Sequence, residues 1–213
     1  PTSGYISTSN NSTLATSSVG ATINNAIYTT KLISIKGISY TSHGISYSAV
    51  INSSAGGVEL TGTTYNSYGL YTASSLITAN YITIVARATV AATYVSYLGP
   101  MTINSGSTGG DITITATGTS AGNDSGIYQS GAISGANGSD ITFTSNNVIN
   151  QLGVITMAAN TNAISNVTYD TTSGNRLSTI SSVAISTTSG STFAINYTAK
   201  SAGSAISVDA ISV

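Results

Sequence analysis

The sequence restarts on nearly the same residues along the chain, and this restart limits the folds that are open to it. One unit opens at Asp111 with DITITATG, and the next opens at Asp140 with DITFTS. The unit starts lie at Ile33, Val58, Ile82, Ile112, Ile141, Val167 and Phe193. Successive starts are 25, 24, 30, 29, 26 and 26 residues apart. A period of this length is typical of solenoids, in which each repeat stacks on its neighbours.

Each unit contains three short stretches in which apolar and polar residues alternate, and this period of two predicts strands that bury one face. In the first stretch, the inward residues expected to form the structural core are Ile33, Ile35, Val58, Leu60, Ile82, Ile84, Ile112, Ile114, Ile141, Phe143, Val167, Tyr169, Phe193 and Ile195. The second stretch often follows a glycine, at Gly44-Ile45, Gly69-Leu70, Gly126-Ile127 and Gly153-Val154. The third contains Val50-Ile51, Leu76-Ile77, Met101, Ile103, Ile133, Ile164, Val183, Ile185 and Ile211.

Three strands and three corners in a unit of this length match one coil of a parallel β-helix, whose coils pair at about 4.8 Å. The sequence therefore predicts an all-β fold, a parallel β-helix (β-solenoid) of about seven to eight coils with 24–30 residues each. Residues 33–213 form the repeat solenoid, and residues 1–32 form an N-terminal coil, a cap or an exchanged strand. A β-sandwich also has short strands at regular spacing. The restart favours the solenoid, because a sandwich need not repeat its residues.

Charged residues make up only 5% of the chain, and the net charge is −1. The basic residues are scattered, so no groove for nucleic acid is expected; they are Lys31, Lys36, Arg87, Arg176 and Lys200. No apolar run of about 18 residues is present, so no membrane span is expected. The absence of cysteine excludes disulfides and thiolate metal sites.

Five stretches carry a family resemblance: GGDITITATG (Gly109–Gly118), SGIYQSGAISG (Ser125–Gly135), SDITFTSNNVINQLGVITMAAN (Ser139–Asn160), VTYDTTSGN (Val167–Asn175) and INYTAKSAGSAISVDAISV (Ile195–Val213). In these stretches the chain resembles the repeat region of large secreted bacterial adhesins of the filamentous-haemagglutinin type. The resemblance implies a right-handed parallel β-helix, export through an outer-membrane partner, and a role in attachment or cell–cell contact. The chain is shorter than such proteins and shows no N-terminal secretion-domain signature.

Asp111 and Asp140 each precede a unit-opening strand, and Asn166 takes the equivalent place in the next unit. Stacked carboxylates of this kind are weak candidates for a Ca²⁺ site. The alternative is that each aspartate caps a turn by accepting backbone N–H groups. We favour the cap, because no GGxGxD repeat is present, and we expect neither a metal nor another cofactor.

His43 is the only histidine, and no carboxylate near it in sequence would orient it for catalysis. Some enzymes with a β-helix fold cluster aspartates with Arg or Lys. Here the acidic residues other than Asp111 and Asp140 fall in different units, away from the bases; they are Glu59, Asp124, Asp170 and Asp209. We therefore expect a non-enzymatic protein with His43 in a loop or corner.

Two outward features could bind a partner. Thr113 with Thr115, and Thr142 with Thr144, are expected to point outward on adjacent coils, where a threonine array could order water and bind ice. An ordinary polar strand face is the alternative. Tyrosine is the dominant aromatic residue, and exposed tyrosines could contact sugars or another subunit; we single out Tyr40, Tyr47, Tyr65, Tyr68, Tyr71, Tyr81, Tyr94 and Tyr97.

The sequence favours an extracellular or cell-surface structural and adhesive module, the stalk of a surface adhesin or fibre. Its expected partners are a cell-surface or glycan ligand, or further copies that stack end to end into a homopolymer. The apolar end ISV suggests either a chain that continues or a stacked subunit. A self-assembling filament subunit with open β edges is the alternative function, followed by an ice- or polysaccharide-binding module.

Overall fold

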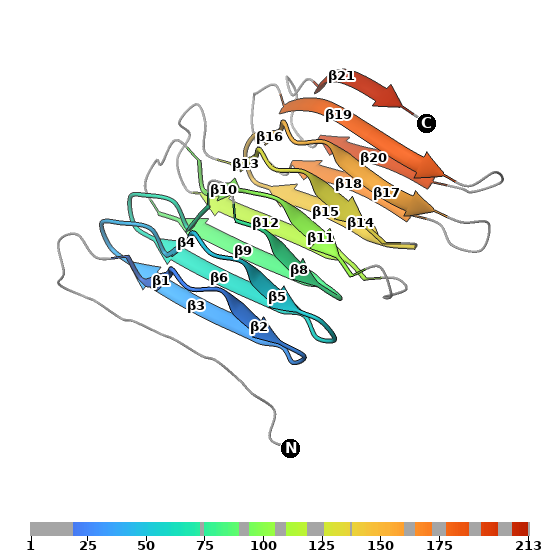
Figure 1. The fold of residues 1–213 in the computed structure, drawn as a ribbon. Helices are drawn as coiled ribbons and strands as arrows, with labels where there is room; N and C mark the ends of the chain where they lie inside the picture. Colours follow the sequence, from blue (N-terminus) through green and yellow to red (C-terminus); the bar gives the residue numbers. More distant parts are fainter. Residues whose placement is uncertain are drawn as a thin grey trace.

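A computed structural model of the chain describes residues 19–72, 75–89, 94–104, 110–118, 126–136, 138–159, 165–171, 178–187, 193–199 and 206–212. Every regular element in these ranges is a β-strand, and every strand pairing is parallel (Figure 1). The expected all-β parallel β-solenoid is therefore confirmed. Within the same ranges no helix has the length and hydropathy needed to cross a membrane.

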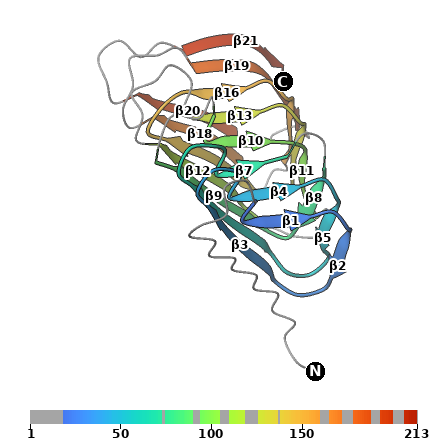
Figure 2. The ribbon, with the colours of Figure 1, turned by 90° about the vertical axis from the view of Figure 1, so that its left-hand side faces the viewer.

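The strands fall into three series that surround one interior (Figure 2). The longest strands form a seven-stranded sheet of β3 (Ile33–Ser39), β6 (Val58–Thr64), β9 (Ile82–Ala88), β12 (Ile112–Gly118), β15 (Asp140–Ser145), β18 (Ser165–Thr171) and β20 (Phe193–Ala199). We call it the long-strand sheet.

The two series of short strands complete each coil. The first contains β1 (Ala21–Ile23), β4 (Ile45–Tyr47), β7 (Leu70–Tyr71), β10 (Ser96–Leu98), β13 (Ile127–Gln129) and β16 (Ile149–Gln151). The second contains β2 (Ile27–Thr29), β5 (Ile51–Ser53), β8 (Ile77–Ala79), β11 (Met101–Ile103), β14 (Ile133–Gly135) and β17 (Ile155–Ala159). β19 (Ser178–Thr187) pairs with both β16 and β17, and β21 (Ile206–Ser212) pairs with β19.

The regular pattern of two short strands and one long strand runs for five turns, from β3 to β18. This is slightly fewer than the seven to eight coils expected from the sequence. The count differs because β19 replaces the two short strands of the next coil with one ten-residue strand. Ahead of β3, β1 and β2 lie in parallel register on β4 and β5. Residues 1–18 of the expected N-terminal coil, cap or exchanged strand are outside the described ranges.

The strand register matches the unit starts read from the sequence, except at the last one. Six starts form one column of paired residues: Ile33, Val58, Ile82, Ile112, Ile141 and Val167. Val167 then pairs with Ile195, whereas Phe193 pairs with Ser165, so the predicted start at Phe193 is two residues too early. The stretch FAINY allows this shift because a slip of two residues leaves the same side chains on each face.

A second prediction is also wrong. Gly153-Val154 was expected to open the second stretch of its unit, but β16 takes that place, and Val154 is an exposed residue before β17. Residues 146–148 alone separate β15 from β16, whereas residues 119–126 separate β12 from β13. Corner length varies between coils, so a constant offset from the unit start selected the wrong stretch.

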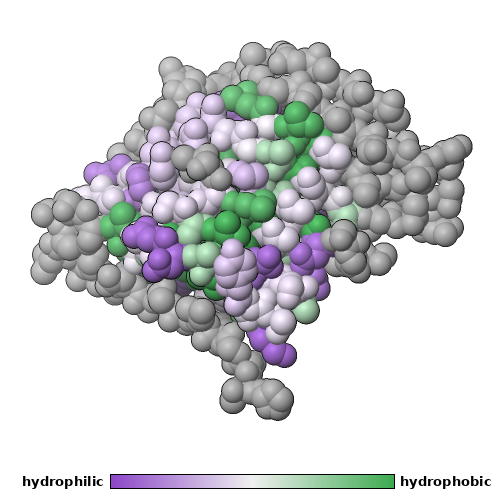
Figure 3. Space-filling view, in the orientation of Figure 1, coloured by the Kyte–Doolittle hydropathy of each residue, from purple (hydrophilic) through white to green (hydrophobic). Residues whose placement is uncertain are grey.

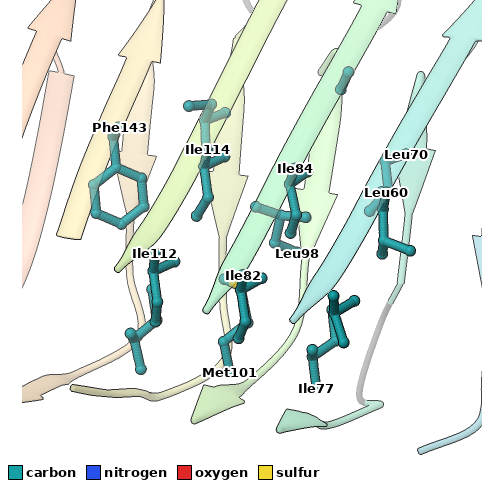
Figure 4. Close-up of a cluster of buried hydrophobic side chains, with 14 of the residues drawn as sticks. Leu60, Leu70, Ile77, Ile82, Ile84, Leu98, Met101, Ile112, Ile114 and Phe143 are labelled. Atoms are coloured by element: carbon teal, nitrogen blue, oxygen red, sulfur yellow. The ribbon is translucent and has the colours of Figure 1, made fainter. Parts of the chain in front are cut away.

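Aliphatic side chains from the three strand series fill the interior. Leu60, Ile84, Ile114 and Phe143 lie in one row on successive long strands (Figure 4). The sequence-selected core residues from Ile33 to Tyr169 are all buried, at 3% exposure or less. The side chains of Phe193 and Ile195 are outside the described part. Each large side chain buried this way contributes roughly 1.5–3 kcal/mol relative to an exposed one.

Within a coil, the backbone of the long strand passes close to the corner that precedes the next short strand. A Cβ atom at Gly62 in β6 would overlap the carbonyl oxygen of Gly69, just before β7. A Cβ atom at Gly37 in β3 would likewise overlap the carbonyl oxygen of Gly44, just before β4. A side chain at either glycine would therefore force the backbone of that coil to move.

Candidate binding faces

The outer face of the long-strand sheet carries threonines in two columns. One column of register partners contains Thr83, Thr113, Thr142 and Thr168 on β9, β12, β15 and β18. The second contains Thr61, Val85, Thr115 and Thr144. All eight side chains are half-exposed. We call these eight residues the threonine face; the expected stacking of Thr113 on Thr142 and of Thr115 on Thr144 is part of it.

Charged residues interrupt this face toward its margins. Glu59 pairs with Thr83, Lys36 pairs with Thr61, and Thr144 pairs with Asp170. Neighbouring columns are two residues apart along a strand, roughly 6.7 Å, and neighbouring coils are roughly 4.8 Å apart. The central strands therefore offer methyl and hydroxyl groups on a small, uncharged, two-dimensional grid. In the orientation of Figure 3, residues of intermediate hydropathy cover much of the described surface, with several small hydrophobic and hydrophilic patches between them.

Aromatic residues gather on the first short-strand series. Tyr71, Tyr97 and Tyr128 are register partners on β7, β10 and β13, and their ring centroids are 5.3 and 4.8 Å apart. Together with three further rings at the preceding corners they make up what we call the aromatic strip: His43, Tyr68, Tyr71, Tyr94, Tyr97 and Tyr128. His43 stacks on Tyr71 and Tyr97 stacks on Tyr128, while the other ring pairs of the strip are tilted or edge-on, as aromatic pairs in proteins commonly are.

His43 lies at the near end of the strip, at the corner before β4. Its ring stacks on Tyr71 with centroids 4.9 Å apart, and its Nδ1 is 2.9 Å from Oγ of Ser67. Burial lowers the pKa of this half-buried imidazole. His43 is thus placed in a corner, as the sequence suggested, but as part of an aromatic stack that the sequence reading did not anticipate.

The structure changes the set of tyrosines that could contact a partner, because it removes Tyr47 and adds Tyr128. Tyr47 points inward from β4 and is fully buried, and burial raises the pKa of its hydroxyl. Tyr128 was not selected, although Gly126-Ile127-Tyr128 repeats the order of Gly69-Leu70-Tyr71. That repeat was the signal by which the sequence could have located it.

Tyr40 and Tyr65 form a separate exposed pair at the corner after the long strands. Their rings are stacked, with centroids 4.6 Å apart and planes 9° apart. Tyr81 lies at another corner, where its hydroxyl donates a hydrogen bond to Oε1 of Glu59, 3.3 Å away. Desolvation, together with the charge and hydrogen bonding of Glu59, raises the pKa of Tyr81.

Asp111 and Asp140 form a ladder of backbone contacts at the start of the long strands. Oδ1 of Asp111 accepts a hydrogen bond from the backbone N–H of Asp140, at 3.1 Å. Oδ1 of Asp140 accepts from both the backbone N–H and the side-chain Nδ2 of Asn166, at 3.2 and 2.7 Å. Each carboxylate thus accepts a backbone N–H at the start of the following coil.

The acidic residues weighed for catalysis occupy separate positions. Glu59 contacts Tyr81, and Asp170 lies at the margin of the threonine face. Asp124 and the side chain of Asp209 are outside the described part. Among the described residues, no three of the histidine and acidic side chains converge into a group that could hold a metal ion.

Comparison with known proteins identifies no relative of this chain. No protein-family model matches the chain, and neither a curated protein nor a solved structure matches it.

Proposed function

We propose that this chain is a non-enzymatic structural and adhesive module of an extracellular surface protein, in which the solenoid acts as a stalk. The observation that carries the proposal is the parallel register of the long-strand sheet from β3 to β20. Hydrogen bonds between coils lie along the axis of the stack, so tension along this axis is shared by three strand series in each regular coil. Such a rod can hold a binding element away from a surface.

The repeat sequence supports both the extracellular location and the adhesive role. The stretches around Asp111 and Asp140 resemble repeats of filamentous-haemagglutinin-type adhesins, which serve attachment outside the cell. The low charge and the hydroxyl-rich outer faces suit a rod whose contacts are short-range rather than steered by charge. A glycan or another cell-surface molecule is the partner class that fits this role.

Electron microscopy of the purified chain at two concentrations tests the proposal. A stalk segment should appear as separate short rods of uniform width, with a length that does not change with concentration. Compact particles without a long axis would contradict it.

A filament subunit is the second candidate, and the same images separate it from a stalk. Within the described residues, the end strands β3 and β20 of the long-strand sheet each have one partner strand. A strand edge that is free can pair with a strand of another copy. Filaments that lengthen with concentration at constant width would favour this candidate.

The in-register threonine columns favour a further binding candidate, a surface for ice. Thermal hysteresis of the purified chain tests it, with Thr113→Tyr as the variant at the centre of the threonine face. Thr102→Tyr is the matched control, because Thr102 is a half-exposed strand residue on β11, in the second short-strand series. Ice binding requires activity that Thr113→Tyr removes and Thr102→Tyr keeps.

A further inference from the structure

The exposed pair Tyr40 and Tyr65 is built by the strand register. Ser39 at the end of β3 pairs with Thr64 at the end of β6, and the backbone N–H of Tyr65 donates to the carbonyl of Ser39 at 3.2 Å. The two tyrosines therefore leave consecutive coils at the same corner. In the next coil Thr89 takes this place, since its N–H donates to the carbonyl of Thr64. Within the described residues this stack therefore contains two rings.

Accessibility and proximity coincide at this pair. Tyr40 is 54% exposed and Tyr65 is 39% exposed, whereas the tyrosines of the aromatic strip are only half-exposed or less. The phenol rings are held at 4.6 Å with nearly parallel planes. Two reactive groups held this close react with a large effective concentration, because the entropy of bringing them together is already lost.

From this geometry we propose that Tyr40 and Tyr65 form an oxidative cross-linking site, at which a haem peroxidase and hydrogen peroxide convert the pair to dityrosine. Each phenol loses one electron and one proton, and the two phenoxyl radicals join through the ring carbons ortho to their hydroxyls. Each ortho carbon then passes its hydrogen to the phenoxyl oxygen as the rings become aromatic again. The protein loses two hydrogen atoms in total, and one hydrogen peroxide accepts the two electrons and two protons to give two waters.

The other exposed tyrosines of the described part have no second ring stacked on them. Tyr28 is 70% exposed, more than either member of the pair, and within the described residues no aromatic ring stacks on it. Tyr81 is similarly exposed to Tyr65, but among the described residues no aromatic ring stacks on it, and its hydroxyl is engaged with Glu59. If accessibility alone decided reactivity, Tyr28 would react first and would link separate molecules. The stacked geometry instead predicts a bond within one chain.

The cross-link would join consecutive coils, as the backbone hydrogen bonds between their strands do. Tyr40 and Tyr65 follow β3 and β6, so a bond between their rings joins two consecutive coils beside the long-strand sheet. This use of the bond rests on the proposed function as a rod under tension. The reactivity of the pair does not rest on it, since it follows from geometry alone.

The test uses the full chain at low concentration with hydrogen peroxide and a haem peroxidase. Dityrosine fluorescence is measured in the monomer fraction, and the linked peptides are located by mass spectrometry. We expect a Tyr40–Tyr65 peptide that lacks two hydrogen atoms, at a yield independent of protein concentration. Tyr65→Phe and Tyr40→Phe should each abolish this peptide, while Tyr28→Phe should keep it.

Two results would overturn the proposal. One is dityrosine found only in covalent dimers, since that indicates collision between exposed residues. The other is a folded monomer, verified by circular dichroism, that forms no Tyr40–Tyr65 peptide. Either result leaves the rod length seen by microscopy unaffected, so this proposal and the stalk function can fail separately.

Discussion

Gln129 and Gln151 are register partners on β13 and β16, yet among the described residues only Gln151 has hydrogen-bond partners for its side-chain amide. Oε1 of Gln151 accepts a hydrogen bond from the hydroxyl of Tyr169 at 3.2 Å, and its Nε2 donates to the carbonyl of Gly153. Gln129 is fully buried, and in the part of the chain that the structure describes neither its Nε2 nor its Oε1 has a hydrogen-bond partner. The two amides therefore make opposite contributions to stability.

Gln129→Met should stabilise the chain. A buried polar group without a hydrogen bond costs about 1–3 kcal/mol, and methionine keeps a similar length without that cost. We expect a higher urea midpoint with an unchanged slope. Gln151→Met is the matched control and should lower the midpoint, because it leaves the Tyr169 hydroxyl and the Gly153 carbonyl without this partner. Equal effects from the two substitutions would contradict the assignment.

Ile114→Asp should unfold the middle coils. Ile114 is fully buried in β12 between Ile84 and Phe143, so the substitution places a carboxylate among aliphatic side chains. The expected loss is about 4 kcal/mol or more in the free energy of unfolding. Thr115→Asp, one residue along and half-exposed, should change it by about 0.5 kcal/mol or less. A urea melt of Ile114→Asp that matches that of the original chain would contradict the burial of Ile114 among apolar side chains.

Gly62→Ala should destabilise the corner between β6 and β7. The added Cβ overlaps the carbonyl oxygen of Gly69, so the backbone of one coil has to move. We expect a loss of roughly 1–3 kcal/mol, the usual cost of overpacking. Ala86→Gly reverses the change at the register partner on β9 and should cost only about 0.5–1 kcal/mol, from chain entropy and lost packing. Urea melts measure both, and the opposite order of costs would contradict the close approach.

The single histidine predicts a pH dependence of stability. Burial lowers the folded-state pKa of His43 below its ordinary value of 6.5, so between these two pKa values the unfolded chain binds more protons. Stability should therefore fall as the pH drops through 6.5 and level off below the folded-state pKa. His43→Phe keeps an aromatic ring beside Tyr71 and should flatten this part of the profile. Urea midpoints measured between pH 5.5 and 7.5 would reveal the difference, and an unchanged profile in the variant would refute it.

Features of the fold with a local physical cause could be predicted from the sequence. The alternation around Ile112 and Ile114 follows from the period of a strand, so the buried face could be assigned without a structure. The repeated opening at Asp111 and Asp140 likewise located the stacked strands. The predictions at Phe193 and at Gly153-Val154 were wrong, because a shift of two residues or a shorter corner leaves the local pattern of apolar and polar residues intact.

The solenoid class, the inward faces of the long strands and the outward stacking of threonines could be predicted from the residues alone, since all three follow from a period of two repeated at regular intervals. Which side chains of different coils meet could be seen only in the folded chain. The stack of Tyr40 on Tyr65, the place of His43 beside Tyr71, and the different surroundings of Gln129 and Gln151 all depend on corner length and register. These are set by the packing of whole coils, which no single stretch of the sequence encodes.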